Sequence, residues 1–90
     1  MHGYERVGRL LYALQRSCGG VDGLRRLQAD ARIDLNVRQR GAALAGRYDM
    51  LYARFTRDAD EVGEHEVDAF LADVAAWMSE VNRRNGAASI

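Results

Sequence analysis

The stretch between Asn36 and Arg57 constrains the fold most, because it carries two regular patterns at once. Apolar or small residues recur at alternating steps of four and three, the spacing of a helix face that packs on another helix. This seam consists of Val37, Gly41, Leu44, Tyr48, Leu51 and Phe55. Beside it runs a row of arginines at steps of seven: Arg40, Arg47 and Arg54. The stretch therefore predicts a long helix with a buried seam and a basic flank.

A later stretch, from Gly63 to Arg84, carries the complementary pattern. Its seam consists of Val67, Phe70, Val74, Trp77 and Val81, and its acidic row of Glu66, Asp73 and Glu80. Antiparallel packing of the two helices matches five residues of each seam in one register: Leu51/Val67, Tyr48/Phe70, Leu44/Val74, Gly41/Trp77 and Val37/Val81. The charged rows then meet as Arg54/Glu66, Arg47/Asp73 and Arg40/Glu80. We therefore predict an antiparallel helical hairpin whose flanking ion pairs set its register.

Two further helices are predicted before this hairpin. The first covers about residues 3–17 and ends at the left-handed stop of Gly19-Gly20. Its seam consists of Tyr4, Val7, Leu11, Leu14 and Cys18, widened by Leu10. The second is short, covers about residues 23–32 after the N-cap Asp22, and turns Leu24, Leu27 and Ala31 inward.

The hairpin helices are expected over about residues 36–58 and 64–84. Asn36 and Gln39 have the spacing of a capping box, and Asp34 is a competing cap, so the third helix starts near residues 35–37. Gly86 is the predicted cap of the fourth helix, and residues 86–90 a frayed tail.

An all-α fold class follows from this pattern, because proline is absent and strand-like alternation nearly so. We predict one domain over residues 1–90, a small bundle of three long helices and one short helix built on the hairpin. The first helix would cover a second apolar strip on the hairpin, and the second helix would close one end. That strip consists of Tyr52, Ala45, Leu71, Ala75 and Met78.

Groups suited to catalysis or metal binding are scarce. Cys18 lies on a predicted seam, where cysteine is usually a small core residue, and His2 is next to the terminus. Glu61 and His65 have the i, i+4 spacing of helix-borne ligands, but a second such pair and the calcium-loop spacing are missing. We therefore expect a non-enzymatic protein with no catalytic residues, no metal site and no cofactor.

The apolar runs are too short to span a membrane, and the first residues lack the apolar core of a signal peptide. A single cysteine fits a reducing compartment. We therefore expect a cytoplasmic protein with no membrane partner.

Arginines outside the hairpin form the candidate binding surface. Arg25, Arg26, Arg32 and Arg38 cluster around the junction of the second and third helices without an assigned acidic partner, and Arg9 and Arg16 project from the first helix. Such a surface suits phosphates and acidic protein surfaces alike. We expect a protein-binding module (a small adaptor, inhibitor or regulatory subunit) that acts through this charged surface.

Two alternatives stay open. The LNVRQR segment resembles the turn and recognition-helix start of helix-turn-helix proteins, which implies a nucleic-acid-binding regulator using Arg25, Arg26, Arg32 and Arg38. Arg32 departs from that pattern, because it takes the place of a small packing residue. The two apolar seams can also pack against each other from different chains, which would give a homodimer.

Overall fold

The computed structural model describes residues 2–89 of the chain, and the side chains of residues 4–83. Its elements are α1 (His2–Cys18), α2 (Gly20–Ala29), α3 (Leu35–Arg57), the short 3-10 helix η1 (Ala59–Glu61) and α4 (Glu64–Ser89). Within residues 2–89 no strand occurs, which confirms the predicted all-α class. The molecule is elongated, measuring 48 × 18 × 17 Å.

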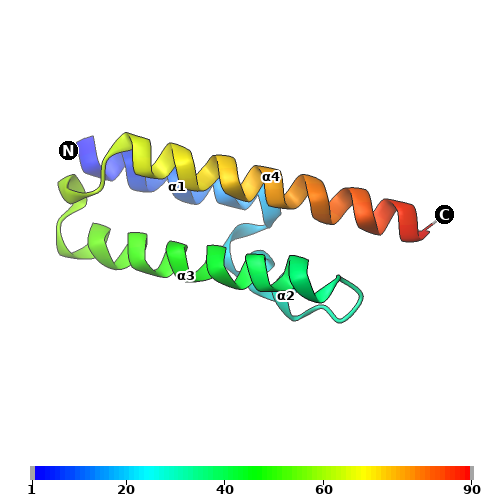
Figure 1. The fold of residues 1–90 in the computed structure, drawn as a ribbon. Coiled ribbons are helices and arrows are strands. Elements are labelled where there is room, and N and C mark those ends of the chain that lie inside the picture. Colours follow the sequence, from blue (N-terminus) through cyan, green and yellow to red (C-terminus); the bar gives the residue numbers. More distant parts are fainter. Residues whose placement is uncertain (1, 90) are drawn as a thin grey trace.

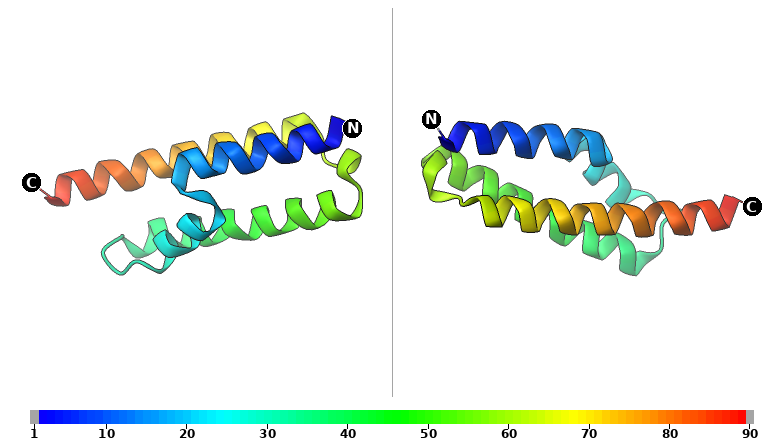
Figure 2. Two further views of the ribbon diagram at one scale, coloured as in Figure 1. Left: turned by 180° about the vertical axis from the view of Figure 1, so that it is seen from behind. Right: turned by 90° about the horizontal axis from the view of Figure 1, so that it is seen from above.

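The helices form two pairs, α1 with α4 and α2 with α3, and the two pairs lie side by side (Figure 1). α3 and α4 run antiparallel and are joined through η1, and α1 lies beside α4 and runs in the same direction. α2 continues from the end of α1 and lies along α3 (Figure 2). The prediction that the second helix closes an end of the bundle is therefore wrong: α2 packs lengthwise on α3.

The α3/α4 seam is built from the predicted residues, all of which are buried. Trp77 crosses the hairpin, and its indole Nε1 donates a hydrogen bond of 2.7 Å to the carbonyl oxygen of Val37. Its ring lies against Gly41, where an added Cβ would come within 2.4 Å of the ring atom Cζ2. The smallest residue of one seam thus faces the largest residue of the other, as the sequence predicts.

α1 turns most of its predicted seam to the core, but not Tyr4 and Leu11. Leu10 and Leu14 are fully buried, whereas Leu11 is 41% exposed and Tyr4 is 73% exposed. The apolar arc of α1 is wider than its contacts with α2 and α4, so the side that carries Tyr4 and Leu11 stays uncovered. Cys18 lies at the edge of the core, half-buried.

α2 begins directly after α1, without the predicted aspartate cap. Its N-cap is Gly19, and both Gly19 and Gly20 have φ of +81°, a conformation that glycine adopts without steric cost. Asp22 consequently lies inside the first turn of α2. Ala31 lies beyond the end of α2 and is exposed, so its predicted inward orientation is wrong, whereas Leu24 is buried.

Asp34 is the cap of α3, because its side chain accepts a hydrogen bond of 3.0 Å from the backbone N–H of Asn36. α4 continues through Ser89, so the helix does not end at Gly86 as predicted. The side chains of residues 84–90 lie outside the described part of the chain.

The second apolar strip is only partly covered. Ala45 is buried, and Leu71 and Met78 are half-buried against the core. Tyr52 is 42% exposed and Ala75 is exposed. α1 thus shields less of the hairpin than the sequence pattern indicates.

Candidate functional site

Most of the arginines predicted as a free basic surface have partners in the fold. The Arg25 guanidinium on α2 donates a hydrogen bond of 2.8 Å to Asp49 on α3. Arg32, in the α2–α3 connection, donates from Nε and Nη2 to both carboxylate oxygens of Asp30, at 3.0 and 2.7 Å. The prediction that these arginines lack acidic partners is therefore wrong for both.

Arg32 also changes the proton affinity of its partner. Hydrogen bonds from its side chain and backbone lower the pKa of Asp30 to about 2, so this carboxylate stays ionised well below neutral pH. The charge of Arg32 is thereby matched locally by that of Asp30.

The two remaining arginines of the α2/α3 junction differ from each other. Arg38 is half-buried and its Nε donates to the carbonyl oxygen of Ile33 at 3.0 Å. Arg26 is exposed, and among the described residues it has no hydrogen-bond or ion-pair partner. Of the four predicted junction residues, only Arg26 offers an unengaged cation.

The two arginines on α1 also have neighbours. Arg9 forms an ion pair with Asp68 near the start of α4. Arg16 donates to the Tyr12 hydroxyl at 3.2 Å, and its guanidinium carbon lies 5.8 Å from the centroid of the Tyr12 ring. Sequence reasoning missed Asp49 and Asp68 as partners because no periodicity shows how α2 lies along α3 or how α1 lies along α4.

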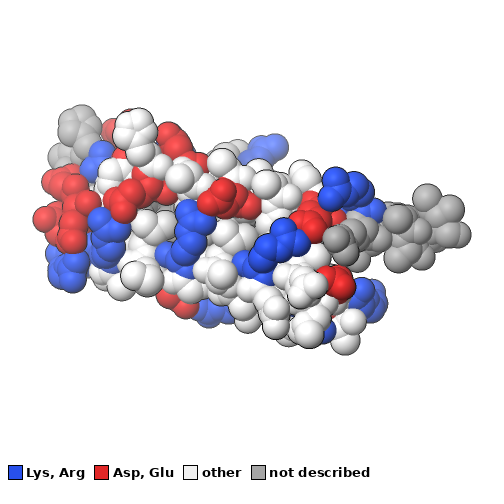
Figure 3. All heavy atoms as spheres, in the orientation of Figure 1, with Lys and Arg blue, Asp and Glu red and all other residues white. Residues whose placement is uncertain are grey.

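The α3/α4 hairpin carries the three predicted ion pairs, which we call the charge ladder. Its rungs are Arg40–Glu80 (2.7 Å), Arg47–Asp73 (2.6 Å) and Arg54–Glu66 (2.6 Å). The rungs follow one another along the exposed face of the hairpin (Figure 3). Arg54 holds the pKa of the Glu66 carboxyl below its usual value, and the backbone N–H of Gly63 adds to this effect.

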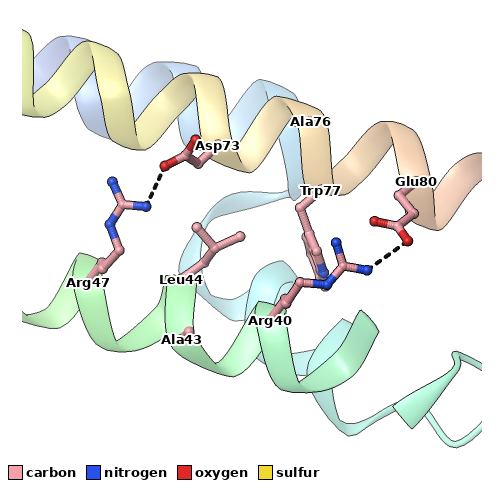
Figure 4. Close-up of a pocket in the computed structure, with 8 residues that line it drawn as sticks. All are labelled: Arg40, Ala43, Leu44, Arg47, Asp73, Ala76, Trp77 and Glu80. Atoms are coloured by element: carbon pink, nitrogen blue, oxygen red, sulfur yellow. Dashed lines mark hydrogen bonds and ion pairs between the residues drawn. The ribbon is translucent and has the colours of Figure 1, made fainter. Parts of the chain in front are cut away.

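Apolar hollows open between the rungs. One has a volume of about 300 Å³ and lies between the Arg40 and Arg47 rungs, where it is lined by Ala43, Leu44 and Trp77 (Figure 4). A second hollow of about 310 Å³ lies between the Arg47 and Arg54 rungs, next to Met50 and Ala69. The hairpin face thus alternates between paired charges and apolar gaps.

A separate apolar surface lies on α1. Tyr4, Gly8, Leu11 and Tyr12 have the i, i+4, i+7 and i+8 spacing of one helix face, and we call them the α1 stripe. Tyr4 is 73% exposed, Tyr12 64% and Leu11 41%. Nothing lies within 4 Å of a Cβ added at Gly8, so this position is open to solvent. This surface was not predicted from the sequence, because the periodicity placed Tyr4 and Leu11 on the buried seam of the first helix.

Residues of catalytic type are not gathered into a site in the described part of the chain. Cys18 Sγ contacts the carbonyl oxygens of Leu14 and Gly20 at 3.5 and 3.4 Å, and burial raises the pKa of this thiol. Among the described residues no three His, Cys, Asp or Glu side chains lie where they would jointly hold a metal ion.

Over the described residues, no helix combines the length and the apolar character that crossing a bilayer requires.

Comparisons of the chain with known protein families, with curated proteins and with solved structures find no match.

Proposed function

We propose that this chain is a non-enzymatic protein-binding module, such as a small adaptor, inhibitor or regulatory subunit of the cytoplasm. The observation that carries the proposal is the α1 stripe, where two tyrosines and a leucine stand exposed on one helix face. Exposed apolar patches of several hundred Å² on small proteins mark interaction surfaces. Tyrosine is also enriched where proteins meet, because it combines apolar area with a polar tip.

The partner that suits this surface is an amphipathic helix of another protein. Gly8 leaves a gap that Tyr4, Leu11 and Tyr12 surround at the spacings of neighbouring helix positions. A large apolar side chain of a partner helix would fill that gap, as a knob fills a hole in helix packing. Arg16, held over the Tyr12 ring, supplies a cation at the edge of the stripe.

The charged junction surface supports binding less well than the sequence suggests. Arg25 and Arg32 already face carboxylates, and Arg38 is bonded to a backbone carbonyl. Binding a phosphate backbone or an acidic protein there would first break these contacts. The nucleic-acid-binding alternative therefore depends on Arg26 and on rearrangement of its neighbours.

A quantitative affinity capture tests the proposal. The wild-type chain, Leu11→Glu and Arg26→Glu are immobilised separately and exposed to extract of the native host, and the retained proteins are quantified by mass spectrometry. We expect at least one protein to be retained by the wild type and Arg26→Glu and lost at least about tenfold with Leu11→Glu, the effect of about 1.4 kcal/mol. Both substitutions are at exposed positions, and thermal melts would verify that the variants fold.

Two outcomes would contradict the proposal. The first is retention of the same proteins by Leu11→Glu as by the wild type. The second is a shift of random duplex or single-stranded nucleic acid at low salt that high salt abolishes and Arg26→Glu weakens, because counterion release makes phosphate binding strongly salt-dependent.

A further inference from the structure

We infer that two copies of this chain associate face to face through their charge ladders, with the twofold axis parallel to α3 and α4. The ladder lies on the α3/α4 face, which Figure 3 shows, and α1 lies behind that face (Figure 2). The inference therefore concerns another surface than the α1 stripe and does not depend on the proposed function.

The arrangement of charge selects this orientation. The arginines all come from α3 and the acids all come from α4, in two parallel rows. A twofold axis parallel to the helices places the arginine row of one copy over the acidic row of the other, without shifting either row along the helix. A twofold axis across the helices would instead place arginine on arginine. The ladder is thus self-complementary in one orientation, as an isologous interface requires.

The central rung has bonding capacity left for a second copy. Arg47 Nη1 donates to Asp73 Oδ2 at 2.6 Å. A guanidinium has five N–H donors and a carboxylate has about four acceptor positions, so this hydrogen bond leaves donors of Arg47 and acceptor positions of Asp73 unused. In the proposed dimer, each Arg47 lies level with the Asp73 of its own chain and with the Asp73 of the other copy. One arginine can then bridge two carboxylates.

Apolar residues between the rungs fit the same orientation. Met50 is 69% exposed and lies beside the hollow of about 310 Å³ that Ala69 also lines. The twofold rotation carries Met50 of one copy over Ala69 of the other, where its side chain would enter that hollow. In the neighbouring gap, Ala43 and Ala76 leave room for close approach of the helices.

The size of the face sets the expected strength of the dimer. The 23 residues of α3 span about 34 Å at the usual rise, and the bundle is 18 Å wide. Each copy would therefore bury about 600 Å², somewhat less than the ~800 Å² of a standard interface. We expect a dissociation constant on the order of 10⁻⁵–10⁻⁴ M, weakened by salt because the rungs are exposed.

Analytical ultracentrifugation of the full chain tests the inference. At low salt, the weight-average mass should rise with concentration from the monomer value of 10.1 kDa toward twice that value, and it should fall back at about 0.5 M NaCl. Met50→Glu should remain monomeric at every concentration, whereas Leu11→Glu should dimerise like the wild type. A wild-type chain that stays monomeric at about 1 mM and low salt would overturn the inference, as would a dimer that Leu11→Glu abolishes and Met50→Glu preserves.

An exchange of the two rows tests the orientation. The variant carries Arg40→Glu, Arg47→Asp and Arg54→Glu together with Glu66→Arg, Asp73→Arg and Glu80→Arg, so its rungs and its self-complementarity remain. It should dimerise with itself. A mixed pair with the wild type places like charges together in the proposed orientation and is complementary only with the twofold axis across the helices, where the η1 ends of the two chains lie at opposite ends of the dimer. Energy transfer between labels near η1 should therefore be strong in pure dimers and weak in mixtures of wild-type and exchanged chains. Energy transfer as strong in the mixtures as in the pure dimers would show that the ladder is outside the interface.

Discussion

Gly41 and the Trp77 ring lie in close contact across the hairpin, as the sequence predicts. Trp77 is 4% exposed and its indole N–H is fixed by the carbonyl of Val37, so the ring cannot move aside at low cost. The absence of a side chain at Gly41 is therefore what lets α3 and α4 approach at this level.

Gly41→Ala should consequently destabilise the fold, although alanine favours helices by about 1 kcal/mol over glycine. Overpacking against the Trp77 ring costs about 1–3 kcal/mol, so we expect a net loss of up to about 2 kcal/mol in the free energy of unfolding. Urea denaturation monitored by Trp77 fluorescence would measure it.

Gly46→Ala is the matched control in the same helix, because nothing lies within 4 Å of an added Cβ there. It should stabilise the fold by about 0.5–1 kcal/mol. An equal stabilisation by Gly41→Ala would show that the ring does not constrain this position.

The residue contacts that sequence reasoning found and missed differ in a simple way. The rung Arg47–Asp73 follows from two periodic rows that fix one register between helices joined by a short connection. The pair Arg25–Asp49 has no such row, since it depends on how α2 leaves the glycine turn and lies along α3. Periodicity predicts partners only where both members repeat.

At the scale of elements, the charge ladder specifies how α3 and α4 meet. Arg47→Glu would face Asp73 with a like charge and remove the guanidinium that lies 5.4 Å from the Phe70 ring centroid. Exposed ion pairs and cation–π contacts each contribute up to about 1 kcal/mol, so we expect a loss of about 1–2 kcal/mol. The measurement is chemical denaturation at low micromolar concentration, where the chain is monomeric.

Adding Asp73→Arg to this variant should restore part of the loss, because the reversed pair recreates the rung in the same register. The contact with Phe70 is not recreated, so recovery should be incomplete. A double variant that unfolds no later than the single one would contradict the register of the ladder.

The helices α1 and α2 show what sequence periodicity predicts and what it does not. The existence of α1 and α2 follows from periodicity and from Gly19-Gly20. The buried face of α1 does not, because Tyr4, Leu10 and Leu11 are all apolar and a stripe this wide fits more than one rotation about the helix axis. The α1 stripe is the part of the candidate site that this ambiguity concealed.

At the scale of the whole molecule, paired carboxylates make stability depend on pH. Arg32 lowers the pKa of Asp30 to about 2, and Arg57 and Arg54 lower the pKa values of Glu61 and Glu66 respectively. A depressed folded-state pKa means that the unfolded chain binds the proton more readily, so the contribution is present above the unfolded value of about 4. It is lost as the pH falls from about 4 toward 2.

We therefore expect the urea midpoint of the wild type to fall as the pH is lowered over that interval. Asp30→Asn should lower the urea midpoint at neutral pH and make its fall at low pH shallower. Repeating the series at about 0.5 M salt should reduce the fall further, because these pairs are exposed. A pH profile unchanged by Asp30→Asn would contradict the assigned role of this carboxylate.

The ladder also has a consequence for the order in which the chain folds. Its rungs join residues that are 12, 26 and 40 positions apart, in sequence from η1 outward. The ion pair of α1 with α4, between Arg9 and Asp68, spans 59 positions. The entropy cost of closing a loop grows with the length of the loop. Each rung that has formed shortens the loop that the next rung must close, so the rungs form most readily in order from η1. We expect α3 and α4 to zip together from η1, with α1 docking last and detaching first in local unfolding.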